Sequence, residues 1–239
     1  MSKPKVVVFD LDETLGYFYQ YSIFADGIEK FTKSKLSTQQ HIQVLKLFPE
    51  YLRPQIKNII KYVLNLKTCG IIEKIYIYTN NQGGPEWTSL IKDYIEHIVG
   101  YNVFDQIINA YKIKHTKIEK LRTRDEKTYK DFLRCSKYNT NNVQICFIDD
   151  QEHPLMAHKN VFYINVKPYI HSIKPSILCD RFLKNNISDG FPRKTFTNFI
   201  KNLFIDYEYD HIEKHNDECE LDKVISKNIL LMLDSFKDK

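Results

Sequence analysis

The sequence predicts an α/β protein built on a parallel, doubly wound, Rossmann-like sheet. Two features of the 239-residue chain support this prediction: apolar runs of strand length, and helix-like patterns between them. The runs are rich in Val, Ile, Phe and Tyr and are mostly continuous, which is typical of strands buried on both faces of a parallel sheet. Five such runs occupy 5–10, 74–80, 104–110, 143–150 and 161–166.

Helical patterns lie between these runs and after the last of them. Three patterns cover 54–66, 85–98 and 125–137, and the third follows a capping-box pair, Thr123 with Glu126 three residues later. Further along the chain, "KTFTNFIKNLF" and "VISKNILLMLDSF" show helix-like spacing without another clear strand. We therefore expect a core over residues 1–175 and a helical C-terminal extension over 176–239 packed on it.

The aromatic stretch "GYFYQYSIF" at 16–24 follows the first predicted strand directly. We expect it to form a small flap, a β-hairpin whose own aromatic side chains pack together. Stacking on a proline-rich peptide or on a base is the alternative.

The composition is that of an ordinary globular protein. Hydrophobic residues make up 43% and charged residues 27%, and the net charge of +5 is too small to indicate a nucleic-acid partner by itself. No apolar run reaches membrane-spanning length and no signal peptide is recognisable, so a cytoplasmic or nuclear location without a membrane partner is expected. The five cysteines are scattered without a CxxC pair, which favours reduced thiols.

Polar side chains end three of the predicted strands. In open α/β sheets, ligands bind at the carboxyl ends of the strands, so we expect these side chains to converge on one crevice. They are Asp10, Asp12, Thr79, Asn80, Asp149 and Asp150.

Two of these carboxylates lie two residues apart. Positions i and i+2 of a strand point to the same side, so Asp10 and Asp12 would repel each other unless a cation lies between them. Mg²⁺ prefers hard oxygen ligands and commonly bridges to a substrate phosphate, and Asp149 or Asp150 would complete its site. The sequence therefore predicts a Mg²⁺ site with Asp10, Asp12, Asp149 and Asp150 as candidate ligands.

A metal at this place makes phosphoryl transfer the predicted chemistry. Asp10 would attack phosphorus to form an aspartyl-phosphate, and Asp12 would protonate the leaving oxygen and then deprotonate water. Thr79 and Asn80 would donate hydrogen bonds to the phosphoryl oxygens, and a lysine must supply a second positive charge.

The order of "DLDETL", "IYIYTNN", a downstream lysine and "CFIDD" resembles the haloacid dehalogenase superfamily of phosphatases. The resemblance covers residues 5 to about 166 and implies the same roles for Asp10 and Asp12. It implies that Thr79 binds phosphate through its hydroxyl, that Asp149 is a metal ligand, and that Asp150 supports the metal.

Within the superfamily, "DLDETL" resembles the RNA polymerase II C-terminal-domain phosphatases and their NLI-interacting-factor-like relatives. "YLRPQIKNIIKYV" is similar to their Arg-Pro-Gly motif, with Gln55 in place of the Gly. This resemblance implies a phosphorylated protein or peptide as substrate, and substrate binding by Thr14, Asn80 and Arg53. The tail "QEHPLMAHKNVFYINVKPY" resembles versions encoded by large DNA viruses, which would act inside a host cell.

"IYTNNQGGPEW" is closer to polynucleotide 3′-phosphatases and histidinol-phosphate phosphatases, which makes a nucleic acid or a small metabolite the alternative substrate. We favour phosphoserine or phosphothreonine on a protein, because no large capping domain is expected between the nucleophile and Arg53. A catalytically inactive phospho-binding protein is a further alternative. The sequence contains no P-loop, no Ser-His-Asp signature and no Cys with Arg six residues later.

The catalytic lysine has two candidates. Lys127 falls in the first turn of the predicted capped helix, where the helix N-terminus favours phosphate. Lys130, in "YKDFL", resembles the Lys-Asp-Leu of the polymerase-tail phosphatases. The basic stretch at 111–124 is interpreted either as a steering surface for an anionic substrate or as a solvated loop.

Three further residues are weighed as a second metal site. His211, His215 and Cys219 recur every four residues and would share one helix face, but their acidic context favours ordinary surface side chains. A local structural role is expected for His153 and His158.

Overall fold

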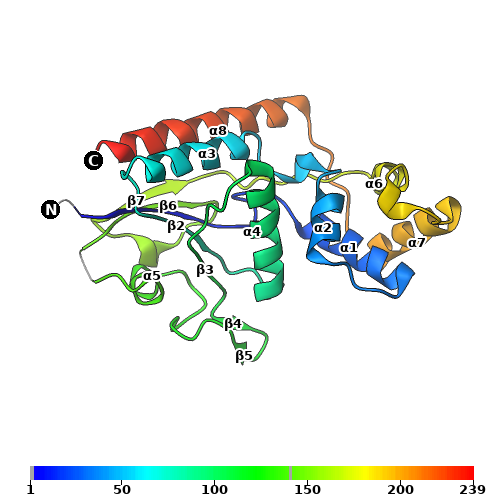
Figure 1. Cartoon of the computed structure of the whole chain (residues 1–239), viewed down its shortest axis with the longest axis horizontal. Helices are drawn as coiled ribbons and strands as arrows, with labels where there is room; N and C mark the ends of the chain where they lie inside the picture. The colour runs from blue at the N-terminus through cyan, green and yellow to red at the C-terminus, as the bar shows by residue number, and fades with distance from the viewer. Residues whose placement is uncertain (1–2, 140–141) are drawn as a thin grey trace. The chain divides into compact units, whose positions relative to one another are not determined.

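The computed structural model describes residues 3–139 and 142–239. Its main sheet has five parallel strands in the order β3-β2-β1-β6-β7 (Figure 1). The strands are β1 (Lys5–Phe9), β2 (Lys74–Tyr78), β3 (Gln106–Ile108), β6 (Gln144–Asp149) and β7 (Val161–Asn165). This is the strand order of a Rossmann-like fold, so the predicted fold class and all five predicted strands are confirmed.

The central strand β1 is buried on both faces, as its continuous apolar run predicted. Val6 and Val8 pack with Phe132 in one hydrophobic cluster, whereas Val7 points to the opposite face because side chains alternate along a strand. Apolar side chains on both faces require cover on both faces, which helices provide.

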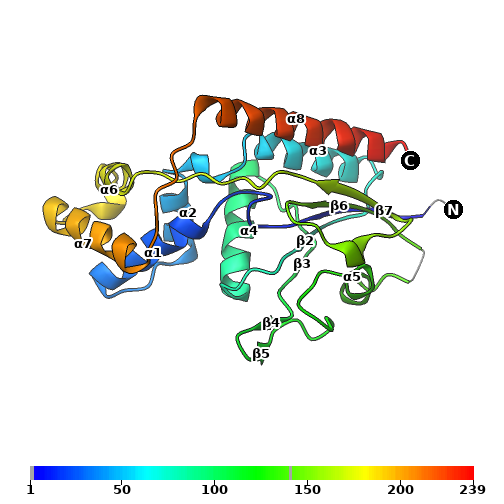
Figure 2. The same ribbon diagram turned by 180° about the vertical axis from the view of Figure 1, so that it is seen from behind.

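The helices grouped with this sheet are α3 (Ile56–Thr68), α4 (Pro85–Val99), α5 (Tyr129–Ser136) and α8 (Asn216–Lys237). Figures 1 and 2 show α8 beside α3 on one face of the sheet, with α5 on the other. The Tyr62 hydroxyl on α3 donates to Asp234 on α8 at 2.6 Å, and the rings of Phe236 and Phe162 stack, with centroids 5.8 Å apart. The sheet is therefore doubly wound, as predicted.

The chain divides into two compact units. The first contains Met1–Gly16, Arg53–Tyr169 and Glu220–Lys239, and the second contains Tyr17–Leu52 and Ile170–Cys219. This grouping differs from the expected division at residue 175, because α8 from Glu220 onward belongs to the unit that carries the sheet, while Ile170–Cys219 belong to the other.

The second unit is helical. Its longer helices are α1 (Tyr19–Thr32), α2 (Thr38–Leu45), α6 (Pro175–Leu183) and α7 (Arg193–Asp206), with the 3₁₀ turns η1 (Pro49–Tyr51) and η3 (Asn186–Ser188). The expected β-hairpin at 16–24 is therefore wrong. Phe24 of α1 makes edge-on ring contacts with Phe182 and Phe196, so these aromatic residues form a core with partners far along the sequence.

The start of α5 also differs from the expectation. The N-cap is Thr128, whose hydroxyl accepts a hydrogen bond from the Asp131 backbone N–H at 2.9 Å, not Thr123. Thr123 instead donates its own N–H and hydroxyl to the buried Asp131 carboxylate. Lys127 consequently lies just before the helix rather than in its first turn.

We expect Thr128→Ala to lower the free energy of unfolding by about 1 kcal/mol, because the α5 N-cap hydrogen bond is lost. Urea denaturation measures this change. Thr128→Ser, which keeps the hydroxyl, should unfold close to the wild type. An unchanged stability in Thr128→Ala would show that the cap does not hold the helix.

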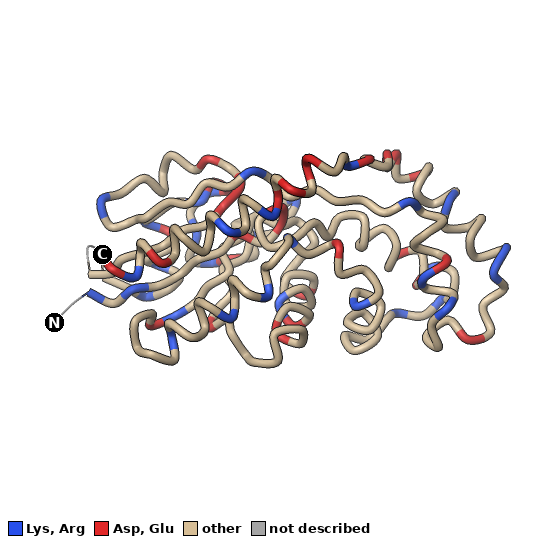
Figure 3. The backbone as a smooth tube through the Cα atoms, turned by 90° about the horizontal axis from the view of Figure 1, so that it is seen from above, with Lys and Arg blue, Asp and Glu red and all other residues tan. Residues whose placement is uncertain are grey.

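Acidic and basic residues both occur throughout the backbone trace in Figure 3. His211 and His215 precede α8 and do not share a helix face with Cys219. None of the helices in residues 3–139 and 142–239 combines the length and the apolar character needed to cross a membrane.

Candidate active site

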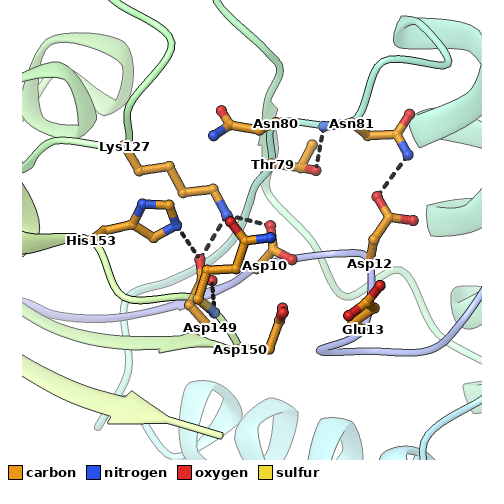
Figure 4. Close-up of a pocket in the computed structure, with 11 residues that line it drawn as sticks. Asp10, Asp12, Glu13, Thr79, Asn80, Asn81, Lys127, Asp149, Asp150 and His153 are labelled. Atoms are coloured by element: carbon orange, nitrogen blue, oxygen red, sulfur yellow. Dashed lines mark hydrogen bonds and ion pairs between the residues drawn. The ribbon is translucent and has the colours of Figure 1, made fainter. Parts of the chain in front are cut away.

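A cavity of about 160 Å³ opens where β1, β2 and β6 end (Figure 4). All six residues predicted from the strand ends line it: Asp10, Asp12, Thr79, Asn80, Asp149 and Asp150. Lys127, one of the two lysine candidates, also lines it. The sheet topology explains this convergence, because β2 and β6 are both direct neighbours of β1 in parallel register.

Three carboxylates in the cavity could share a metal ion. One oxygen each from Asp10, Asp149 and Asp150 lies within 4.8 Å of the others, and all three residues are largely buried. Burial raises the pKa of Asp10 well above its usual value, and it also raises the pKa of Asp150. Hard oxygen donors with excess negative charge are the donor set that Mg²⁺ prefers, so these residues fit the ion.

Asp12 is not a member of this carboxylate group. Its Oδ2 accepts a hydrogen bond from the Asn81 side-chain N–H at 2.6 Å, and Figure 4 shows its carboxylate turned toward Asn81. The expected i, i+2 strand geometry of Asp10 and Asp12 is absent because β1 already ends at Phe9 and Glu13 turns the chain with a φ of +58°. The ligand role of Asp12 stays a prediction. Burial raises the pKa of Asp12, which favours the protonated form of its carboxyl group. The hydrogen bond from Asn81 offsets part of this rise.

Lys127 is the cation of the cavity. Its ammonium donates to the Asp10 carboxylate and to Asp149 Oδ2, the latter at 2.7 Å, and only 2% of the side chain is exposed. Burial alone would lower the lysine pKa, but Asp10 and Asp149 raise it, so Lys127 is held charged. Lys130 does not line the cavity and lies exposed on α5. The geometry thus favours Lys127 over Lys130.

A buried arginine shapes the loops that bring Lys127 and Thr79 to the cavity. The Arg122 guanidinium is 0% exposed and donates to the backbone carbonyls of Thr79 and Asp125, at 3.1 and 2.7 Å. It also donates to the Asn109 carbonyl at 2.9 Å. These bonds connect the end of β2 to the segment before α5, and sequence reasoning assigned Arg122 no such role.

The Thr79–Asn81 segment forms the rim of the cavity at the end of β2. The Thr79 hydroxyl accepts a hydrogen bond from the Asn81 backbone N–H at 3.0 Å, which leaves its own proton available for a ligand. Asn80 Oδ1 is buried and has no hydrogen-bond partner among the described residues. The Thr79 hydroxyl is therefore placed to donate to a phosphoryl oxygen, whereas Asn80 Oδ1 can only accept a hydrogen bond from a donor on a ligand.

Two residues expected to bind substrate contact the protein instead. The Thr14 hydroxyl donates to Asp150 Oδ1 at 2.9 Å and accepts from the Asp150 N–H, so it orients that carboxylate. Arg53 is buried and donates to the backbone carbonyls of Glu13, Thr14 and Lys167. Neither residue lines the cavity.

His153 is a cavity residue to which sequence reasoning gave only a local structural role. Its Nε2 lies 3.4 Å from Asp149 Oδ2. Burial alone would raise the pKa of Asp149, but the His153 hydrogen bond and the Lys127 charge lower it. The signal in the sequence was its position four residues after Asp149, which becomes meaningful only once the turn after β6 is known.

Comparison with known proteins adds one weak likeness. No family model matches the chain, and no curated protein matches it. Among solved structures, a protein from Thermotoga maritima described as a candidate beta-phosphoglucomutase is similar with a TM-score of 0.38 and 10% identity, over 83% of this chain and 99% of that one. A likeness at this level shows neither a family nor a function for this chain.

We expect Mg²⁺ to raise the thermal midpoint of the protein, because ion binding to the folded state stabilises it by about 2.7 kcal/mol at a hundredfold excess over Kd. Differential scanning fluorimetry measures the shift. Asp149→Asn and Asp150→Asn should lose it, whereas Asp12→Asn, whose carboxylate lies outside the group, should keep it. Equal shifts in all three variants would contradict the ligand assignment.

The same shift should depend on pH. The pKa of Asp10 is raised above its unfolded value, so in metal-free protein this group contributes stability that is present at low pH and is lost as pH rises through its folded pKa. Mg²⁺ needs the ionised carboxylates, so the gain from Mg²⁺ should run in the opposite direction. It should shrink as pH falls through the raised folded pKa of Asp10, which lies above the ordinary carboxyl value of about 4.

Proposed function

We propose that this protein is a Mg²⁺-dependent phosphoric monoester hydrolase of the haloacid dehalogenase type, acting through an aspartyl-phosphate on Asp10. The observation that carries the proposal is the placement of the buried Asp10 carboxylate between Lys127 and the two carboxylates at the end of β6. An unreactive structural cluster would not require a nucleophile, a cation and excess negative charge at the mouth of one cavity.

Asp10, Asp149 and Asp150 would hold the metal ion. When bound, Mg²⁺ supplies positive charge for the phosphoryl oxygens and neutralises the carboxylates around it. The chain's own residues then determine the orientation of the substrate and the path of each proton.

Asp10 and Asp12 have different roles in the two half-reactions: Asp10 is the nucleophile, and Asp12 transfers the proton in each step. The Asp10 carboxylate attacks phosphorus, the bond from phosphorus to the ester oxygen breaks, and the leaving oxygen takes a proton from Asp12. In the second step Asp12 accepts a proton from the water that attacks phosphorus, which releases phosphate and regenerates Asp10. The raised pKa of Asp12 suits the acid step, and Asn81 orients its carboxyl group.

Lys127 and Thr79 would stabilise the phosphoryl group during transfer. The Lys127 ammonium is held in place by Asp10 and Asp149, so little reorganisation is needed when charge develops on the phosphoryl oxygens. The free hydroxyl proton of Thr79 provides a donor from the neighbouring strand.

For the substrate we propose phosphoserine or phosphothreonine of a protein, such as a polymerase C-terminal tail. Residues 17–52 belong to a second helical unit rather than to a small flap, so the expected lack of a large capping domain no longer favours this class. The remaining support is the resemblance of "DLDETL". A 3′-phosphorylated nucleic acid and a small phosphorylated metabolite are the other outcomes of the test.

The test is a panel of substrates assayed with Mg²⁺ and with EDTA. Hydrolysis of an aryl phosphate that requires Mg²⁺ supports the proposed chemistry. A phosphopeptide, a 3′-phosphorylated oligonucleotide and sugar phosphates then separate the substrate classes by kcat/KM. Absence of hydrolysis with every substrate, despite folded protein that binds Mg²⁺, would overturn the proposal in favour of a phospho-binding protein.

A further inference from the structure

A short hairpin carries an uncompensated cluster of positive charge. Its strands β4 (Lys112–Ile113) and β5 (Thr116–Lys117) pair antiparallel, with Lys112 directly opposite Lys117. Like charges opposite each other destabilise a strand pair. Both ammonium groups lie 5.0 Å from the ring centroid of Tyr111, so the ring holds them on one part of the hairpin.

Within residues 3–139 and 142–239, no carboxylate lies within ion-pair distance of this cluster. Lys112, Lys117 and the turn residue Lys114 are all exposed, and none of them forms an ion pair with the described residues. Lys114 adopts a φ of +52° at the turn, a conformation that a lysine rarely adopts. The hairpin thus presents three exposed cations to solvent.

The hairpin is linked directly to the rim of the candidate active site. The Gln82 side-chain N–H donates to the Asn80 carbonyl at 2.9 Å and to the Lys112 carbonyl at 3.4 Å. Asn80 lines the cavity, so a single side chain joins the cavity rim to the hairpin. A substrate chain with its phosphate in the cavity can therefore reach the hairpin within a few residues, since each extended residue spans about 3.3 Å.

The other surface beside the cavity has the opposite charge. A second cavity of about 330 Å³ shares Asn80, Lys127 and His153 with the first. Its exposed carboxylates are Asp125, Glu126 and Glu152. Negative charge on a substrate is therefore favoured toward the hairpin and disfavoured toward the second cavity.

We propose that the hairpin of Lys112, Lys114 and Lys117 binds a second anionic group, a phosphoryl or carboxylate group, on a phosphopeptide whose phosphorylated residue occupies the cavity. This inference rests on the proposed function and adds the charge pattern of its substrate. The three cations form a second anion site, distinct from the cavity.

A peptide fits these surfaces better than a nucleic acid does. A peptide continues on both sides of an internal phosphoserine and can carry different charges on the two sides, whereas an oligonucleotide is negative at every unit. The hairpin also lacks what single-stranded nucleic acids need, because Tyr111 is only partly exposed and lies beneath two lysines rather than being open to a base.

The experiment compares two peptides that share one phosphoserine. Within three residues of it, one peptide carries a second phosphoserine and the other carries an unmodified serine. The wild type should bind the doubly phosphorylated peptide more tightly and hydrolyse it with a KM about fivefold lower, as for an exposed charge pair. The double variant Lys112→Gln with Lys117→Gln should lose this preference without losing activity on an aryl phosphate. Lys57→Gln, which removes an exposed lysine on α3, should keep it.

Salt provides an independent readout. The preference should weaken as ionic strength rises from about 0.1 M to 1 M, where the Debye length falls from about 10 to 3 Å. A preference that persists in the double variant, or no preference in the wild type, overturns the inference. Higher kcat/KM on a 3′-phosphorylated oligonucleotide than on either peptide also overturns it, in favour of a nucleic acid.

The failure of this inference differs from failure of the proposed function. Mg²⁺-dependent hydrolysis of an aryl phosphate without any peptide preference removes only the hairpin site. Absence of hydrolysis with every substrate of the panel removes the proposed function. The peptide preference can then still be measured as a difference in Kd.

Discussion

Asp10→Asn should lose at least about a thousandfold in hydrolysis rate while unfolding at the same temperature as the wild type or higher. The amide cannot form an aspartyl-phosphate. The substitution also removes a buried carboxyl group. Burial and the nearby carboxylates raise the pKa of this group well above its usual value, so its ionised form is unfavourable. Steady-state assays and thermal unfolding in EDTA measure the two effects.

The combination of these two results distinguishes a nucleophile from a structural carboxylate. If Asp10 mainly held Lys127 in place, Asp10→Asn would lower the thermal midpoint and the loss of activity would follow from unfolding. Glu13→Gln is the matched control, because Glu13 lines the same cavity without belonging to the carboxylate group. It should retain most of the activity.

Lys127→Met is expected to destabilise the metal-free protein by about 3–5 kcal/mol and to abolish activity. Its removal leaves Asp10 and Asp149 as buried carboxylates without their cation, and an uncompensated buried charge is strongly destabilising. Chemical denaturation in EDTA measures the stability. Lys130→Met, at an exposed position of α5, should change stability and activity little.

A double-mutant cycle tests the cause of that loss. Adding Asp10→Asn to Lys127→Met should recover more stability than Asp10→Asn gains in the wild type, because one of the two unpaired charges is removed. Strictly additive losses would mean that Lys127 stabilises the fold by packing alone. Loss of activity in Lys130→Met, with Lys127→Met active, would reverse the lysine assignment.

The strands and the convergence of their ends were predictable because both follow from local pattern and sheet geometry. The apolar run before Asp10 can be buried only as a central strand, and its parallel neighbours bring Thr79 and Asp149 to the same edge. The residues at strand ends thus needed no knowledge of the loops.

The loops and the second unit were not predictable in this way, because they depend on contacts between distant residues. The position of Lys127 depends on Arg122, whose buried guanidinium holds backbone carbonyls of three segments. The segment after the first strand is helical because Phe24 packs against aromatic residues more than 150 positions away. Neither contact leaves a periodic signal in the sequence.

The central claim is that Asp10 becomes phosphorylated during turnover. Protein incubated with substrate and Mg²⁺ can be quenched with borohydride, which reduces an aspartyl-phosphate to homoserine, and the modified residue located by peptide mass spectrometry. We expect homoserine at position 10 only when substrate and Mg²⁺ are both present. Active protein with unmodified Asp10, or with the modification at Asp12, would contradict the account.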